Sequence, residues 1–258
     1  MTTELHGKVG IVTGGTSGIG RDTAVLFAKA GAKVVVAGRR DVEGKETIEL
    51  IRATGGEGVF VKTDVSRAGE VQALVQKTVE KFGRLDIAFN NAGIEGNWVP
   101  IAEQSEEDWD RVIAINLKGV WLSLKYEIQQ MLKQGGGGAI VNMSSVAGQI
   151  GSAGAAAYCA SKHGVIALTR TAALENARSG IRVNAVCPAV IETPMAERIF
   201  GAPEMNKFAL GLHPVGRFGT PMEIAEAVVW MLSGRASFMT GSFLTLDGGM
   251  LAGPNPPH

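Results

Sequence analysis

The apolar positions of the chain form short unbroken runs, which alternate with longer segments where apolar residues recur every three or four positions. The short runs lack the polar alternation of a half-exposed strand, so we predict strands that are buried on both faces. They lie at residues 8–12, 33–37, 58–62, 85–90, 139–143, 182–186 and 243–246. We predict helices at residues 19–30, 42–53, 68–82, 106–134, 153–177 and 221–233.

This alternation of strand and helix is typical of an α/β fold with a doubly wound parallel sheet flanked by helices. No internal repeat or long linker divides the chain, so we expect a single domain over residues 1–258. Residues 190–212 interrupt the alternation and include several large apolar side chains. We predict that this insert is a lid over the substrate.

Composition narrows the possible partners. The 25 basic and 25 acidic residues cancel, so the chain has no basic field of the kind that attracts nucleic acid or acidic lipid. The first residues lack the apolar core of a signal peptide, and no run approaches the ~20 apolar residues that span a bilayer. We expect a cytoplasmic protein without nucleic-acid or membrane partners. The two cysteines and four histidines show no ligand spacing, so we predict no metal site.

A glycine-rich loop, Thr13–Gly20, follows the first predicted strand and enters a helix. In a parallel sheet, ligands bind beyond the carboxyl ends of the strands, and the free N–H groups of a helix N-terminus suit a pyrophosphate. A plain tight turn is the alternative reading, but the loop opens a βαβ unit. We therefore predict dinucleotide contacts at Gly14, Thr16, Ser17, Gly18, Ile19 and Gly20.

The end of the second strand bears on the choice of cofactor. A carboxylate there would bond the ribose hydroxyls of NAD, whereas an arginine can neutralise a 2′-phosphate. Gly38 leaves the carboxylate position empty, and Arg39 and Arg40 follow it. We expect NADP(H), with NAD(H) still open because Asp41 could reach the ribose and the arginines could simply be solvated. Further cofactor contacts are expected at Asp64, Val65, Asn91, Ala92 and Gly93.

Tyr158 and Lys162 lie four residues apart in a predicted helix and so share one face. A free phenol titrates near pH ~10, and a fixed cation nearby lowers that pKa. A tyrosine tuned in this way can exchange a proton with a carbonyl oxygen. Such pairs also arise by chance on solvated helices. The catalytic interpretation therefore depends on Ser145, thirteen residues earlier, and on Asn116 further upstream.

In these features the chain resembles the classical short-chain dehydrogenase/reductase family over nearly its whole length. The matching motifs are T-G-x-x-x-G-x-G at Thr13–Gly20, N-N-A-G at Asn90–Gly93 and Y-x-x-x-K at Tyr158 and Lys162, with Ser145 and Asn116 in the expected order. The resemblance implies a Rossmann-type sheet of about seven strands and a nicotinamide cofactor. It also implies a homotetramer built on the helices that carry Asn116 and Tyr158.

The resemblance implies roles as well. Tyr158 would donate a proton to the carbonyl in reduction and accept one in alcohol oxidation. Lys162 would lower the pKa of Tyr158 and bind the nicotinamide ribose. Ser145 would orient the substrate oxygen, and Asn116 would hold a water that links Lys162 to solvent.

The segment Val186–Thr193 resembles the family's nicotinamide-side P-G segment, with Ala189 where glycine is usual. If that backbone required a positive φ, alanine would be strained there. We expect cofactor contacts at Pro188, Ile191 and Thr193. Substrate contacts are expected at Ser145, Tyr158 and Val190, with specificity set by Glu95–Pro100, Val146–Ala156 and Val190–Leu212.

We therefore predict an oxidoreductase that transfers a hydride between NADP(H) and a ketone or secondary alcohol of some bulk and apolar character. One alternative is a sugar dehydrogenase, for example a glucose 1-dehydrogenase. An alternative of a different class is a dinucleotide-binding regulatory protein without turnover. The presence of Ser145, Tyr158 and Lys162 argues against the regulatory protein, because a sensor has no need of a tuned phenol.

Overall fold

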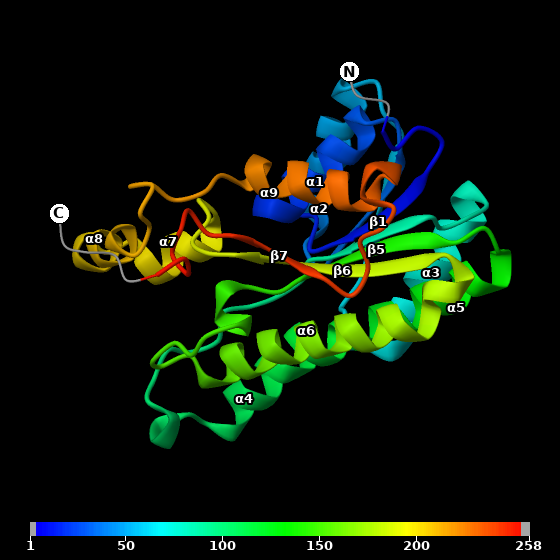
Figure 1. The fold of residues 1–258 in the computed structure, drawn as a ribbon. Coiled ribbons are helices and arrows are strands. Elements are labelled where there is room, and N and C mark those ends of the chain that lie inside the picture. The colour runs from blue at the N-terminus through cyan, green and yellow to red at the C-terminus, as the bar shows by residue number, and fades with distance from the viewer. Residues whose placement is uncertain (1–3, 254–258) are drawn as a thin grey trace.

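A sheet of seven parallel strands forms the centre of the protein (Figure 1). The computed structural model describes residues 4–253. The strands are β1 (Val9–Thr13), β2 (Lys33–Gly38), β3 (Gly58–Lys62), β4 (Ile87–Asn90), β5 (Gly138–Met143), β6 (Ile181–Pro188) and β7 (Phe243–Leu246). Their order across the sheet is β3-β2-β1-β4-β5-β6-β7, which confirms the predicted doubly wound fold. The strand order reverses between β1 and β4, where such sheets bind ligands.

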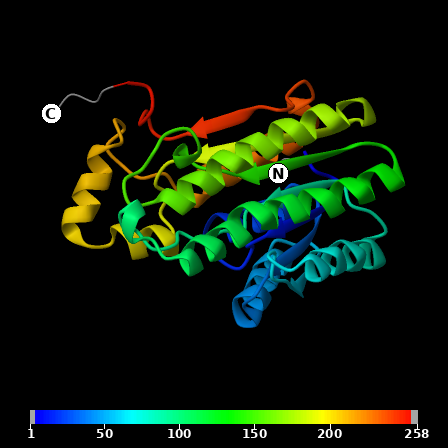
Figure 2. The same ribbon diagram turned by 90° about the horizontal axis from the view of Figure 1, so that it is seen from below.

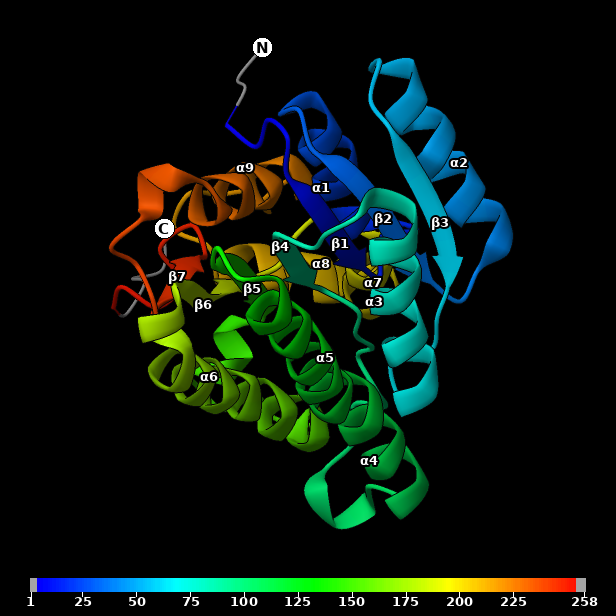
Figure 3. The same cartoon turned by 90° about the vertical axis from the view of Figure 1, so that its right-hand side faces the viewer.

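Two layers of helices cover the sheet (Figures 1 and 3). One layer contains α1 (Gly18–Lys29), α2 (Asp41–Ala53) and α9 (Pro221–Leu232), and the other contains α3 (Ala68–Phe82), α5 (Gly119–Gln134) and α6 (Ala156–Asn176). Neighbouring strand residues face opposite layers, so Val12 packs in the core beneath α1 and Ile11 in the core beneath α5 and α6. Both positions are apolar, which explains the unbroken apolar runs in the sequence.

The predicted helix 106–134 contains a local change of winding. It comprises α4 (Glu106–Ile113), one π-helical turn (Ala114–Lys118) and α5. Viewed from below, α4, α5 and α6 lie along the same outer face (Figure 2). Helix α6 begins three residues later than predicted, because the chain turns at Gly154, whose φ is +81°. Glycine adopts this left-handed conformation without the steric cost of a side chain.

The predicted insert folds into two short helices, α7 (Pro194–Phe200) and α8 (Pro203–Gly211), beyond the carboxyl ends of the strands. Each begins with proline at its first turn, where the missing N–H costs no helical hydrogen bond. A bridge between Ile191 and Gly219 joins the start of the insert to the segment that follows it. Within residues 4–253, the helices are too short or too polar to cross a membrane.

Candidate active site

A cleft of about 660 Å³ opens beyond the carboxyl ends of the strands, between the sheet and α7. The loops after β1 to β6 all contribute to its walls. It brings together most of the residues predicted for the site: Gly14, Thr16, Ser17, Gly18, Ile19, Arg39, Arg40, Asp64, Val65, Asn91, Ala92, Gly93, Ser145, Tyr158, Lys162, Pro188, Val190, Ile191 and Thr193. Gly20 and Asn116 are outside this lining and support it from behind.

The loop after β1 has the form of an anion cradle. Gly14 and Gly18 have φ of +67° and +51°, which a side chain would strain. A Cβ on Gly20 would lie 2.3 Å from the Gly14 carbonyl oxygen, so only glycine lets the helix start approach the loop. Ser17 precedes α1 without capping it. The first N–H groups of α1 are thus left for an anion such as a pyrophosphate, and the cradle fits a dinucleotide.

The end of β2 is shaped by Gly38 and two arginines. A Cβ on Gly38 would lie 2.6 Å from Thr16 Cγ2, so the carboxylate that NAD favours has no room in this conformation. Arg40 Nη2 donates to Thr16 Oγ1 at 2.8 Å and to Ser17 Oγ at 2.7 Å. Its Nη1 pairs with Glu43 at 3.2 Å. Arg39 lines the same end of the cleft.

Asp64, at the predicted adenine position, stays ionised. Burial alone would raise its pKa, but hydrogen bonds from Ser66 and the charges of Arg39 and Arg67 outweigh that effect and lower it. The carboxyl Oδ1 accepts from Ser66 N at 3.0 Å and from Ser66 Oγ at 2.7 Å.

The loop after β4 is fastened to the phosphate loop. Asn91 Nδ2 donates to the carbonyl oxygens of Thr13 at 3.1 Å and of Gly14 at 3.3 Å. The backbone N–H of Ala92 donates to Thr13 Oγ1 at 3.1 Å. The N-N-A-G segment therefore holds the glycine loop in place as well as lining the cleft.

Asn116 lies in the π-helical turn and is fully buried. Its Nδ2 donates to the Ile94 carbonyl oxygen and its Oδ1 accepts from Ile94 N, both at 2.8 Å. Nδ2 also donates to Ser161 Oγ at 3.3 Å. Both polar atoms of the side chain therefore bond protein groups, and Asn116 clamps the chain just after Gly93. The water relay expected of it stays a prediction.

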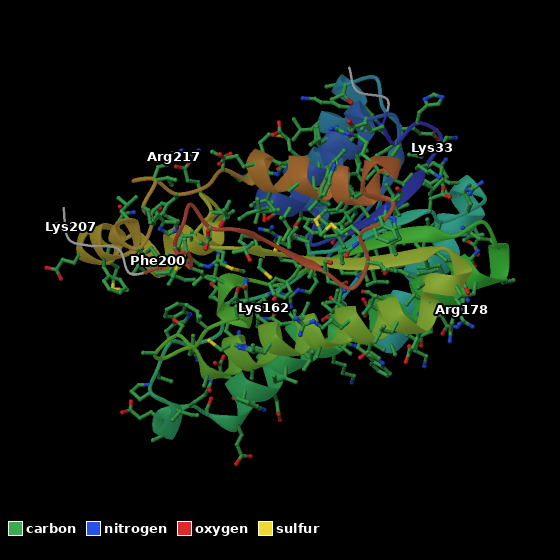
Figure 4. All side chains as sticks on the ribbon, viewed as in Figure 1. Lys33, Lys162, Arg178, Phe200, Lys207 and Arg217 are labelled. Atoms are coloured by element: carbon green, nitrogen blue, oxygen red, sulfur yellow. The ribbon has the colours of Figure 1, made fainter. Side chains whose placement is uncertain are left out.

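Ser145, Tyr158 and Lys162 meet on one wall of the cleft. Lys162, labelled in Figure 4 between α6 and the sheet, is 3% exposed. Its Nζ donates to the Met143 carbonyl oxygen at 2.9 Å and lies 5.4 Å from the centroid of the Tyr158 ring. Ser145 hydrogen bonds with the phenol. The hydroxyl of the neighbouring Ser144 instead donates to the Lys162 carbonyl oxygen at 2.9 Å, so Ser145 is the serine that meets the phenol.

The protein's own groups do not lower the Tyr158 pKa as the sequence predicted. Burial raises the pKa of Tyr158 to about 12, and the hydrogen bond with Ser145 opposes that rise. Burial lowers the pKa of Lys162 to about 8. Desolvation is thus a larger influence on the phenol than its cationic neighbour. At neutral pH the phenol is protonated and ready to donate.

A family model described as Enoyl-(Acyl carrier protein) reductase matches residues 14–251, which is nearly the whole chain and contains the motifs above except for Thr13. The chain belongs to the short-chain dehydrogenase/reductase family.

Relatives in this family are dehydrogenases and reductases. The chain is 48% identical over 250 residues to a short chain dehydrogenase/reductase, astE, of Aspergillus oryzae. The match covers 95% of each chain. It is 43% identical to a 2,5-dichloro-2,5-cyclohexadiene-1,4-diol dehydrogenase of Sphingobium indicum, over 96% of this chain and 99% of the relative. It is 44% identical to a cyclohexanol dehydrogenase of an Acinetobacter strain, over 96% of each.

Solved structures of dehydrogenases and reductases have the same fold as this chain. Levodione reductase superposes with a TM-score of 0.93 and 38% identity, over 97% of this chain and 100% of that one. A putative 2-deoxy-D-gluconate 3-dehydrogenase of Agrobacterium tumefaciens, with bound NADP, superposes with a TM-score of 0.89 and 36% sequence identity. The match covers 97% of this chain and 99% of that one. This short-chain dehydrogenase/reductase is therefore an NAD(P)-dependent enzyme acting on CH–OH or C=O groups, and the regulatory alternative is set aside.

One departure from the family pattern proves harmless. Ala189, where the family usually has glycine, does not adopt a positive φ. Its backbone N–H donates to the Leu246 carbonyl oxygen at 3.1 Å, in register with β7. The strain considered for this position therefore does not arise.

Sequence reasoning missed three features of this short-chain dehydrogenase/reductase site. Arg198 pairs with Glu95 across the cleft at 2.7 Å. Trp98 and Phe200 meet edge to face, with ring centroids 5.8 Å apart. His213 Nε2 accepts from Val190 N at 3.3 Å. Each contact joins segments far apart in the chain, so no local pattern signals the pairing. Among residues 4–253, no three His, Cys, Asp or Glu side chains cluster in a way that could hold a metal.

Proposed function

We propose that this enzyme is an NADP(H)-dependent carbonyl reductase and alcohol dehydrogenase for ketones and secondary alcohols. The observation that carries the proposal is the convergence of Ser145, Tyr158 and Lys162 on the cleft wall next to a dinucleotide cradle. A neutral hydroxyl, a phenol and a buried ammonium are the groups that a proton transfer to a carbonyl oxygen requires.

The chain's own residues would act as follows. The bound nicotinamide supplies or accepts the hydride. Tyr158 gives its proton to the substrate oxygen in reduction and takes one in oxidation, while Ser145 orients that oxygen beside the phenol. Lys162, already aligned by the Met143 carbonyl, holds the nicotinamide ribose. Asn116 keeps the segment after Gly93 in place.

The end of β2 supports NADP(H) over NAD(H). Arg39 and Arg40 bring positive charge to the position where a 2′-phosphate would lie, and Gly38 with Thr16 leaves no space for a competing carboxylate. The related Agrobacterium structure with bound NADP is consistent with this preference.

The substrate end of the cleft supports a cyclic, largely apolar substrate. Its walls are mostly hydrocarbon and aromatic side chains: Trp98, Ile150, Met195, Ile199, Phe200, Phe208, Leu212 and Met250. Relatives whose names specify cyclohexanol and a cyclohexadiene diol point to rings of similar size. Apart from Glu95 and Arg198, this wall offers few polar partners for a sugar, although the Agrobacterium relative is named for a sugar acid.

We also propose that the enzyme is a cytoplasmic homotetramer assembled through the outer face of α5 and α6. Trp121 on α5 and Leu174 on α6 are 45% and 84% exposed. Exposed large apolar groups on one face are typical of subunit interfaces. Light scattering of the purified protein would measure the assembly, and a monomer at micromolar concentration would contradict it.

The test of function is a substrate screen. Purified enzyme is given NADPH or NADH with monocyclic ketones, aryl ketones and keto-aldonic acids, and the loss of reduced-nicotinamide absorbance is followed. Alcohols, aldoses and aldonic acids are tested with NADP⁺ or NAD⁺. We expect turnover of cyclic ketones with NADPH preferred. Activity confined to sugars would favour the alternative, and cofactor binding without turnover of any substrate would contradict the proposal.

A further inference from the structure

An ion pair spans the substrate end of the cleft. Arg198, on α7, donates through Nε to Glu95 Oε1 at 2.7 Å and through Nη2 to Glu95 Oε2 at 3.3 Å. Glu95 lies just after the N-N-A-G segment, and it is 103 positions away from Arg198 in the chain. Both residues line the cleft. A two-point contact between a guanidinium and a carboxylate defines orientation as well as distance.

A second contact joins the same two segments. The rings of Trp98 and Phe200 meet at 86°, which places an edge of one against the face of the other. Phe200, labelled in Figure 4, is the last residue of α7, and Trp98 lies on the loop after β4. The loop is itself anchored, because Val99 N donates to the Gly154 carbonyl oxygen at 3.0 Å. Helix α7 is therefore tied to a fixed wall at two points, and we call this pair of contacts the clasp.

The clasp is polar at one end and lies close to the reacting groups. Burial is the main cause of the raised pKa of Tyr158, and the charge of Glu95 adds to it. Hydrogen bonding and the charge of Arg198 lower the pKa of Glu95 against the effect of its burial. Glu95 is thus a carboxylate in the same cleft as the phenol, and Arg198 balances its charge.

The clasp is also weak enough to open. The Arg198 side chain is 59% exposed and that of Glu95 19%, and exposed ion pairs contribute little to stability. Residues of α7 line the same cleft as Ser145 and Tyr158, and a contact that breaks easily suits a helix that acts as a lid.

From these contacts we propose that the Glu95–Arg198 pair, with Trp98 and Phe200, fastens α7 over the substrate and makes Arg198 a specificity-determining, positioning residue. The proposal rests on the proposed function. A monocyclic ketone fits beneath the closed clasp, whereas a larger ring system has to hold it open. Loss of the clasp therefore weakens binding of the small ketone and reduces discrimination against the large one.

Hydrogen exchange tests the clasp without any substrate. Backbone amides of residues 195–200 are followed in the full-length wild-type protein, in Arg198→Met, in Glu95→Arg, and in the charge-swapped double variant Glu95→Arg/Arg198→Glu. We expect exchange about threefold to fivefold faster in each single variant, the range for one exposed ion pair, and near wild-type exchange in the double variant.

A matched control is available at the other end of the molecule. Arg235 pairs with Glu4 at the same 2.7 Å, with side chains 66% and 20% exposed. The variant Arg235→Met should leave exchange in α7 unchanged. Exchange in Arg198→Met equal to wild type, or faster exchange in the double variant than in the singles, would overturn the proposal.

Kinetics then separate specificity from general loosening. In Arg198→Met we expect KM for a monocyclic ketone to rise about fivefold, with kcat nearly unchanged. The ratio of kcat/KM for the monocyclic ketone to kcat/KM for a polycyclic ketone should fall by a similar factor. An unchanged preference would overturn the specificity role. If the wild-type enzyme turned over no ketone, the proposed function would fail, while the exchange result would still decide whether the clasp exists.

Discussion

At Tyr158, two physical effects oppose each other. Burial raises the pKa of the phenol to about 12, while a hydrogen bond with Ser145 pulls it down. The same burial lowers the pKa of Lys162 to about 8. A protonated phenol beside a cation that titrates just above neutral pH is suited to donate a proton to a carbonyl oxygen.

Replacing Tyr158 by phenylalanine should therefore remove the proton donor and leave the cleft intact. We expect kcat for ketone reduction to fall about 10²- to 10⁴-fold, the usual contribution of general acid catalysis. NADPH affinity, measured by fluorescence titration, should change little. Equal losses of affinity and turnover would contradict the role of proton donor.

The two directions of reaction should respond to pH in opposite ways. In oxidation the phenol must lose its proton, and a raised pKa makes the phenolate rare at neutral pH, so kcat/KM for the alcohol should rise with pH through the alkaline range. In reduction the phenol is already protonated, so kcat/KM should be level near neutrality and fall above about pH 8, as Lys162 loses its charge. Initial rates from pH 6 to 10 in both directions test this, and parallel profiles would contradict it.

The arginines after β2 should decide the choice of cofactor. In Arg39→Gln and Arg40→Gln we expect the Kd of NADPH to rise about tenfold or more, because charge-assisted bonds to a phosphate are lost, while NADH affinity changes little. Arg52→Gln is the control, since Arg52 lies at the exposed far end of α2. An unchanged ratio of NADPH to NADH affinity would remove the 2′-phosphate assignment.

Sequence spacing was sufficient at this scale to choose residues but not to assign their protonation. The four-residue separation of Tyr158 and Lys162 predicts a shared helix face, and the structure shows both side chains in the cleft. Their pKa values depend on how completely other segments exclude water from them. That exclusion is a property of the folded molecule, so the expected lowering of the phenol pKa was wrong.

At the scale of elements, the π-helical turn at residues 114–118 is the feature that shapes the site. It places Asn116 where its amide bonds both backbone groups of Ile94. Such local widening of a helix is often found at functional sites. The apolar periodicity continues through residues 106–134, so the sequence predicted one uninterrupted helix and did not reveal the turn.

The variant Asn116→Ala should lower both the stability of the protein and its affinity for NADPH. Two partly buried backbone groups of Ile94 would lose their partners, and we expect the free energy of unfolding to fall by about 2 kcal/mol. Because Ile94 follows Gly93 in the cleft wall, NADPH affinity should fall as well. Urea denaturation and nucleotide titration measure the two effects.

The chain contains a matched control for this variant. Gln134, on α5, clamps both backbone groups of Leu85 just before β4, away from the cleft. Gln134→Ala should cost similar stability and leave NADPH affinity unchanged. If both variants weakened NADPH binding equally, Asn116 would have no specific role in the cleft.

At the scale of the whole molecule, a buried polar network joins the sheet to the helices beneath it. Asn90 Nδ2 donates to Glu127 on α5 and to Asn142 on β5, each at 3.0 Å. Asn142 Nδ2 donates in turn to Thr169 on α6 at 3.0 Å. All four residues are buried. The network links β4, β5, α5 and α6 behind the cleft.

Glu127 should make stability depend on pH. Burial raises its pKa to about 7, above that of a carboxyl in the unfolded chain, so the folded state favours the protonated form. The favourable contribution is present below pH ~4.5 and is lost as pH rises to about 7, a decrease of about 3 kcal/mol. Urea denaturation at pH 5 and pH 8 should show this decrease in wild type and a much smaller one in Glu127→Gln. An equal decrease in the free energy of unfolding in both proteins would contradict the raised pKa of Glu127.

The sequence by itself determined the fold class and the composition of the cleft. Strands that must be buried on both faces and that alternate with helices favour a parallel sheet covered by helices. Parallel strands then bring every loop at their carboxyl ends to one edge, so Gly14, Asn91, Ser145 and Pro188 meet without any further information.

Only the tertiary structure decided what the assembled residues do to one another. The Glu95–Arg198 pair, the clamp on Ile94 and the network around Glu127 each join segments distant along the chain, and no periodicity encodes which partner is met. The pKa values of Tyr158 and Lys162 follow from the water that neighbouring segments displace. Distance in space and local dielectric are set only when the chain has folded.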